Sequence, residues 1–185
     1  MTIENVHYVN LFLGTSIIIM FALALLALMF LMLKVRENAY LSFVKNNFLL
    51  IGFLVSLSAM LASLFYSEVV NFVPCFLCWV QRIFIYPQVI LFGIAWYKKD
   101  RGVIKYSLPL LLVGILFSIY HVYIYYFGEG NAPCDPSGVS CVKRLVHEFG
   151  GLISIPSMAF MTFGILIIIL LVAYFYHKDY QQNNP

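Results

Sequence analysis

Charged side chains are scarce in this 185-residue sequence: Asp, Glu, Lys and Arg make up 10% of it, against 63% hydrophobic residues. An average globular domain carries about a quarter charged residues. The composition therefore excludes an ordinary water-soluble domain. The net charge of +3 comes from scattered residues, without a basic patch or a row of aromatic residues among basic ones. This pattern also excludes a nucleic acid as the partner.

Long polar segments are also rare, and the apolar runs between them are long. A helix needs roughly 20 apolar residues to cross about 30 Å of hydrocarbon. The sequence therefore predicts an all-α integral membrane protein with five crossings and no separate soluble domain. The five apolar runs span residues 10–33, 48–70, 77–97, 106–127 and 152–176.

Positive charge is absent from residues 1–10, so we do not expect a cleaved secretory signal, which begins with a positively charged region. Lys and Arg are concentrated in residues 34–47 and 98–105, which the positive-inside rule places in the cytoplasm. The N-terminus is then outside, residues 128–151 form an external loop, and the tail 177–185 is cytoplasmic. Eight of the eleven Lys and Arg fall on the predicted inner side: Lys34, Arg36, Lys45, Lys98, Lys99, Arg101, Lys105 and Lys178.

Cysteine is rare too, and the predicted topology places all four cysteines at or beyond the outer face, where disulfides persist. Cys75 and Cys78 stand where the third crossing begins. With Arg82 they are spaced i, i+3 and i+7, which puts them on one face of a helix. The N-terminal end of a helix and a nearby cation both favour a thiolate, here on Cys78. The alternative is a chance pair of small apolar residues beside an interfacial Arg.

The second pair, Cys134 and Cys141, lies in the one long polar stretch, residues 128–141, whose Gly and Pro predict a loop. Six residues separate the two thiols, so a disulfide between them is feasible, either as a structural crosslink or as a redox pair. Four cysteines permit three connectivities, and electron transfer between pairs would use more than one of them. The next residues, 142–149, have the apolar spacing of a short helix lying in the membrane interface.

The residues around the first pair carry a resemblance. The segment Cys75-Phe-Leu-Cys78-Trp79-Val-Gln81-Arg82, with Tyr86-Pro87 beyond it, is similar to the C-x-x-C-W-x-Q-R and Tyr-Pro motifs of the DsbB/BdbC family of quinone-dependent thiol oxidases. In many members a Gln follows the His of the third matching crossing by four positions, whereas Tyr125 stands there in this chain. Three further segments support the likeness: Tyr120-His121, Gly138–Cys141 and Gly151–Ser157.

The resemblance implies a fold and a bound cofactor. The fold is a four-helix membrane bundle over about residues 48–176, including the external loop, in a bacterial cytoplasmic membrane. Residues 1–47 would add one crossing and a cytoplasmic connection to it. The cofactor is a quinone, ubiquinone or menaquinone, beside Cys78 and Arg82. His121 is a candidate quinone contact or proton carrier, or else a histidine that only packs between helices.

The resemblance also implies an electron path. The loop pair would oxidise a DsbA-like partner of the thioredoxin fold through Cys134. Cys141 would then exchange with Cys75, and electrons would leave through Cys78 to the quinone. We therefore expect a membrane thiol:quinone oxidoreductase that supports disulfide formation in exported proteins.

Two alternatives remain at this point. A vitamin-K-epoxide-reductase-like enzyme also joins a membrane Cys-x-x-Cys to a loop pair, but its loop pair precedes the motif, whereas here it follows. A non-enzymatic membrane protein with structural disulfides, or with a four-thiolate metal site, would also use four cysteines. Oxidising surroundings favour disulfides over a metal, so we expect no metal ion.

Overall fold

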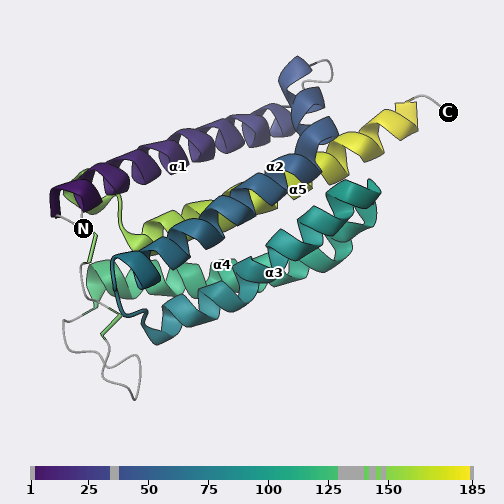
Figure 1. Ribbon diagram of the computed structural model, residues 1–185. Coiled ribbons are helices and arrows are strands. Elements are labelled where there is room, and N and C mark those ends of the chain that lie inside the picture. The colour runs from purple at the N-terminus through teal and green to yellow at the C-terminus, as the bar shows by residue number, and fades with distance from the viewer. Residues whose placement is uncertain (1–2, 34–37, 129–139, 142–144, 147–148, 184–185) are drawn as a thin grey trace.

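The computed structural model describes residues 3–33, 38–128, 140–141, 145–146 and 149–183 (Figure 1). These residues confirm the all-α prediction, because all five expected crossings are helices long and apolar enough to span a membrane. The long helices are α1 (Ile3–Met32), α2 (Ala39–Leu64), α3 (Phe76–Lys98), α4 (Ile104–Phe127) and α5 (Ile155–Asn183). Three short elements accompany them: the π-helical turn η1 (Phe65–Val69) and the 3₁₀ turns η2 (Arg101–Val103) and η3 (Phe149–Gly151).

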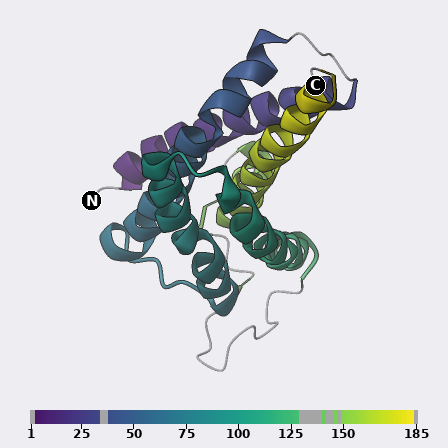
Figure 2. The same cartoon turned by 90° about the vertical axis from the view of Figure 1, so that its right-hand side faces the viewer.

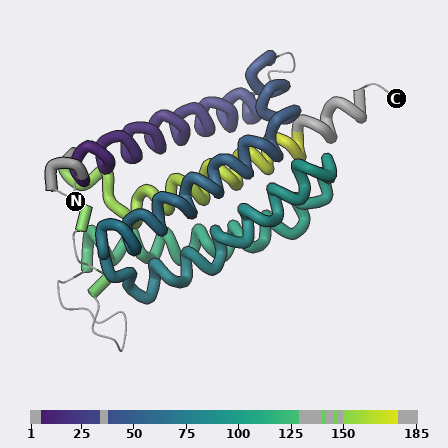
Figure 3. The backbone as a smooth tube through the Cα atoms, viewed as in Figure 1, coloured from purple at the N-terminus to yellow at the C-terminus, as the bar shows by residue number. Residues whose placement is uncertain are grey.

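Four of the helices close a bundle, and the fifth lies against its outside. α2 packs on α3, α3 on α4, α4 on α5, and α5 back on α2. α1 packs mainly on α5 and to a smaller extent on α2, as Figures 1 and 3 show. The end view in Figure 2 separates α1 from α3 and α4, which lie on the other side of the bundle. The arrangement confirms a four-helix bundle with one additional N-terminal helix.

Close packing inside the bundle depends on glycines. The core side chains Phe92 and Phe163 are almost fully buried. A Cβ atom on Gly52 would lie 2.7 Å from the Phe92 ring, and one on Gly114 would lie 2.4 Å from the Phe163 ring. Within lipid the hydrophobic effect does not drive helices together, because the lipid tails are as apolar as the side chains. Small residues that allow close approach therefore stabilise the helix contacts through van der Waals packing.

The segment between η1 and α3 sets the position of the first cysteine pair. Asn71 takes a left-handed backbone conformation with φ of 61°, which turns the chain after η1. Cys75 is the N-cap of α3, with an extended backbone at φ −73° and ψ 171°. Cys78 is therefore the third residue of the helix. Its predicted place in the first helical turn is confirmed.

α2 begins at Ala39, inside the stretch 34–47 that was predicted to be the cytoplasmic connection, and the Asn38 side chain there accepts a hydrogen bond from the Tyr40 N–H. The cytoplasmic position of this stretch stays a prediction. One other sequence-based prediction was wrong. The helix predicted over 142–149 does not form at Leu145 and Val146. Val146 is buried and its carbonyl accepts a hydrogen bond from Tyr125 of α4, which fixes the chain against the bundle. Residues 142–144 and 147–148 lie outside the described ranges.

The contact between Gly114 and Phe163 yields a stability prediction. In Gly114→Leu the added side chain has no space against α5, and overpacking of a core costs about 1–3 kcal/mol. We expect the apparent Tm of the purified protein in detergent to fall by several degrees. Val113→Leu is the matched control, because this neighbour is 40% exposed on the outer face of α4. Equal Tm values for the two variants would contradict the packing argument.

Candidate redox site

The two thiols at the start of α3 lie within hydrogen-bonding distance of each other. Cys75 Sγ and Cys78 Sγ are 3.3 Å apart, whereas a disulfide bond is about 2.05 Å long. Cys75 is buried and Cys78 is partly exposed. The two sulfur atoms are therefore close enough for a disulfide bond to form between them, and Cys78 is the more exposed residue of the two.

The surroundings of Cys75 favour its thiolate. The hydrogen bond with Cys78 lowers the pKa of the Cys75 thiol most, and His121 lowers it further, while burial acts in the opposite direction. When Cys75 is ionised, the Cys78 S–H is the donor to it. The negative charge of the dithiol pair therefore belongs on Cys75. Sequence analysis placed the thiolate on Cys78 with help from Arg82, whereas these contacts favour it on Cys75, and Arg82 donates its hydrogen bonds to Ser63.

His121 of α4 is held between Cys75 and Gln81. Its Nε2 lies 3.8 Å from Cys75 Sγ, and its Nδ1 lies 3.2 Å from the Gln81 side-chain nitrogen. An amide nitrogen only donates, so Nδ1 accepts and the proton of the neutral ring sits on Nε2, facing the sulfur. His121 is 2% exposed and Gln81 is 5% exposed. The sequence motif contains Gln81, but its spacing alone does not reveal that it contacts a histidine forty residues later.

Arg82 ties α3 to α2. Its Nε donates to Ser63 Oγ at 2.8 Å, and its Nη2 donates to the Ser63 backbone oxygen at 2.9 Å. The Tyr86 hydroxyl adds a 3.3 Å hydrogen bond to the same Ser63 Oγ, and the guanidinium carbon lies 5.1 Å from the centre of the Trp79 ring. Two hydrogen bonds and one aromatic contact thus stabilise the positive charge of Arg82 near the end of the membrane helix. Sequence analysis missed Ser63, since α2 carries other serines and no spacing distinguishes this one.

Cys141, in the connection between α4 and α5, packs against the α3 pair. It is 3% exposed and belongs to one apolar cluster with Cys75, Leu77 and Ile124, against which Cys78 also packs. The structure thus brings together three of the four predicted redox cysteines. Cys134 lies outside the described residues.

A cavity of about 350 Å³ adjoins these side chains. The volume lies within the usual range of small-molecule sites, which are mostly apolar with a few polar groups. Its polar lining includes Arg82, Gln81 and His121, and Cys78 also faces it, while Val55 and Ile85 are among its apolar residues. N–H donors together with an apolar wall fit a ring that carries two carbonyl oxygens and an apolar tail. The cavity residues therefore fit a quinone.

Three side chains of the site also have the composition of a metal-binding site. The donor atoms of Cys75, Cys78 and His121 all lie within 4.8 Å of one another. Thiolate and imidazole ligands are those that Zn²⁺ prefers. The four-thiolate site considered from the sequence would also need Cys134, which is not described.

The comparisons with known proteins agree on one family. A family model described as "Disulfide bond formation protein DsbB" matches residues 45–175. Disulfide bond formation protein C of Bacillus subtilis is 44% identical over 125 residues, which cover 66% of this chain and 89% of that protein. A probable disulfide formation protein of Coxiella burnetii is 41% identical over 143 residues, covering 76% of this chain and 95% of the relative. A probable disulfide formation protein C 2 of Bacillus cereus is 36% identical over 132 residues, covering 71% and 94%.

No solved structure matches the chain significantly. The family match nevertheless covers well over half of the sequence and includes both described thiols of α3, Arg82, His121 and Cys141. The chain, with its five membrane-length helices, therefore belongs to the DsbB family of membrane disulfide bond formation proteins.

Proposed function

We propose that this protein is a membrane thiol:quinone oxidoreductase that reoxidises a DsbA-like partner of the thioredoxin fold. Electrons would pass from Cys134 and Cys141 to Cys75 and Cys78, and then to ubiquinone or menaquinone. The observation that carries the proposal is the meeting of Cys141 with the α3 thiols beside an apolar cavity. The family, whose members are named for disulfide bond formation, supports the thiol chemistry.

The first steps are thiol–disulfide exchanges. The partner's dithiol reduces the Cys134–Cys141 disulfide and becomes a disulfide itself. The Cys141 thiolate then attacks Cys75 in the Cys75–Cys78 disulfide, and Cys78 leaves. Cys134 next attacks Cys141, which restores the loop disulfide and releases Cys75 as a thiolate. A thiol of low pKa leaves faster, so the lowered pKa of Cys75 suits it to this role.

The resulting dithiol must lose two electrons and two protons, which a quinone bound in the cavity would accept. Cys78 faces the cavity and is the exit point for the electrons. Formation of the Cys75–Cys78 bond would release these two electrons and two protons from the pair. Arg82 supplies positive charge at the cavity wall, and Ser63 holds it there. His121 keeps its Nε2 proton directed at Cys75 during the exchange.

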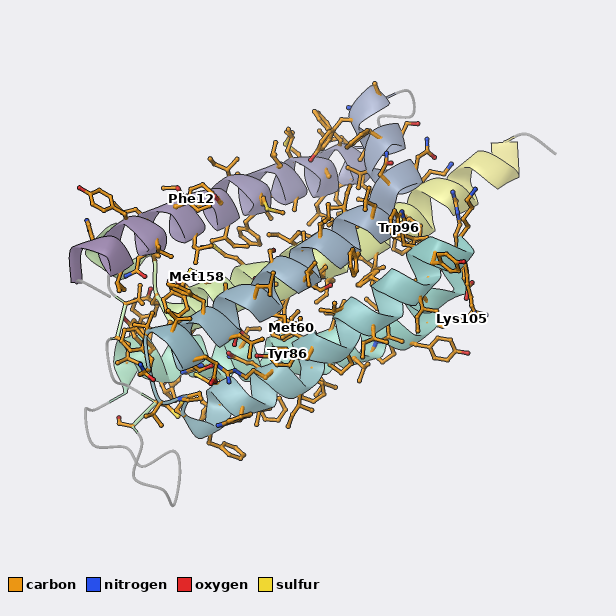
Figure 4. The ribbon with its side chains drawn as sticks, in the orientation of Figure 1. Phe12, Met60, Tyr86, Trp96, Lys105 and Met158 are labelled. Carbon is orange, nitrogen blue, oxygen red and sulfur yellow. The ribbon has the colours of Figure 1, made fainter. Side chains whose placement is uncertain are left out.

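Under this proposal the redox end faces the outside of the cytoplasmic membrane. The basic residues of η2 and its flanks lie at the opposite end of the bundle from Cys75, because α3 begins at one end and finishes at the other. Figure 4 shows Trp96 and Lys105 at that far end, away from Phe12 and Met158. The positive-inside rule supports a cytoplasmic position for them.

The order of electron transfer predicts a distinctive defect in Cys75→Ser and Cys78→Ser. Each variant should oxidise about one equivalent of a reduced thioredoxin-like partner through its loop disulfide and then stop, because the loop pair cannot be reoxidised. Partner oxidation is followed by thiol titration in the presence of excess quinone. Ile90→Ala, 64% exposed on the same helix and outside the cavity, should turn over normally. Continued turnover in either cysteine variant would refute the proposed path.

The place of Arg82 predicts that Arg82→Ala impairs quinone use more than partner use. Loss of a charge-assisted contact, about 1.5–3 kcal/mol, should raise the KM for a short-chain quinone on the order of tenfold or more. The KM for the reduced partner should stay unchanged. Ser63→Ala keeps the charge and should have a smaller effect, and Ile83→Ala, 63% exposed on the same helix, should have none. An unchanged quinone KM in Arg82→Ala would remove Arg82 from the site.

The contact between Gln81 and His121 predicts a change in thiol ionisation. Gln81→Leu removes the donor that fixes the His121 proton on Nε2, so the Cys75 thiolate loses hydrogen bonding and its pKa rises. A rise of about one is expected, since a hydrogen bond to a charged group contributes about 1.5–3 kcal/mol and one pKa unit equals about 1.36 kcal/mol. Less thiolate is then present at a given pH, and alkylation of Cys75 shifts to higher pH.

The measurement is the pH dependence of iodoacetamide labelling of Cys75 in the reduced protein, with Cys134 and Cys141 replaced by Ser. Gln88→Leu is the matched control, because Gln88 is a buried glutamine two turns further along α3 that donates to the Phe84 carbonyl. Identical midpoints for the Gln81 and Gln88 variants would show that Gln81 does not control Cys75.

A further inference from the structure

Helix α1 lies outside the part of the chain that matches the family, which begins at residue 45. The matched relatives are short: the 132 aligned residues make up 94% of the Bacillus cereus protein, so about eight of its residues remain unmatched. That remainder is too short for a counterpart of the 30-residue α1. This helix is therefore a feature of this chain that family membership does not explain.

The structure shows α1 taking part in the cavity beside the redox pair. Five of its residues line the cavity: Phe12, Leu13, Ser16, Ile17 and Met20. They follow the spacing i, i+1, i+4, i+5 and i+8, so they form one stripe along one face of the helix. At 1.5 Å per residue the stripe is about 12 Å long. The cavity also reaches Cys78 and Arg82, so a single space connects the redox group to α1.

Specific contacts hold this stripe in place. Asn10 and Tyr66 are both 6% exposed, and the Tyr66 hydroxyl donates a 2.8 Å hydrogen bond to Asn10 Oδ1. Gly14 lies so close to the loop before α5 that a Cβ atom there would be 2.3 Å from the Ile153 side chain. A buried polar pair and a close glycine contact are costly to replace within a membrane, so α1 has a fixed position next to the cavity.

We propose that α1 is a wall of the quinone site, with its Phe12–Met20 stripe lying against the apolar tail of the quinone near the ring. This inference rests on the proposed function and adds a determinant of specificity to it. Because five lining residues come from α1, the cavity would be open to lipid on that side without the helix. The wall restricts the shape and bulk of the quinone tail that fits beside Cys78.

Photolabelling tests the contact directly on the unaltered protein. A short-chain ubiquinone that carries an azido group on its tail is bound, irradiated and mapped by mass spectrometry. Labels within residues 12–20 are expected. Labels confined to α2–α5 would overturn the role of α1 while leaving quinone binding intact. The absence of any saturable label, together with the absence of quinone reduction, would overturn the proposed function as well.

A pair of tryptophan variants tests the specificity. Ser16 is the small residue in the middle of the stripe, and Ser16→Trp fills the cavity at that point. We expect the Kd of the short-chain quinone, measured by equilibrium dialysis, to rise on the order of tenfold, with the partner's KM unchanged. Ile19→Trp adds the same bulk on the outer face of α1, where Ile19 is 60% exposed, and should leave the Kd unchanged. Equal Kd values for the two variants would overturn the proposal.

Discussion

The contact between the start of α3 and His121 of α4 is the constraint on which the rest of the site depends. Cys75 is an N-cap residue, so its position follows from where α3 begins, and His121 meets it only if α3 and α4 keep their register. Gln81, two turns into α3, repeats the contact from the other side of the imidazole. Two points of attachment to one ring leave little freedom for sliding of the helices. The packing of α3 on α4 therefore also aligns Cys75 with His121.

The remaining helices can be understood as supports for that alignment. Arg82 attaches α3 to α2 through Ser63, and the Tyr125 hydroxyl holds the connection between α4 and α5 at Val146. Both contacts lie at the same end of the bundle as the thiols. A hydrogen bond in surroundings of low dielectric constant is stronger than one on a water-exposed surface, so each of these bonds restrains its two partners more strongly. Further from the thiols, the helices are held together by close packing, for example of Phe163 against Gly114.

The five membrane helices and the place of Cys78 in the first turn of α3 could be predicted from the sequence, but the contacts between distant residues of the site could not. Crossing length and apolar composition are local properties, so the five helices were predictable. The first-turn position of Cys78 was predictable because a proline-containing turn precedes an apolar run. Ser63 and the contact of Gln81 with His121 join residues far apart in the chain, and no local pattern encodes them. The helix predicted over 142–149 failed for the same reason, since burial of Val146 against α4 outweighs the apolar spacing.

Under the proposed path, the environment of Cys75 also favours one direction of electron flow. A dithiol whose thiolate is stabilised has a more stable reduced form, and this raises the reduction potential of the corresponding disulfide. Cys78 and His121 stabilise the Cys75 thiolate, so the α3 pair is made a better acceptor of electrons from Cys141. The same stabilisation makes its own reoxidation harder, and a stronger oxidant than an ordinary protein disulfide is then required. A cavity with N–H donors beside Cys78 is where the proposed quinone would have access, so under the proposed function the favourable first transfer and the requirement for a strong oxidant have one physical origin.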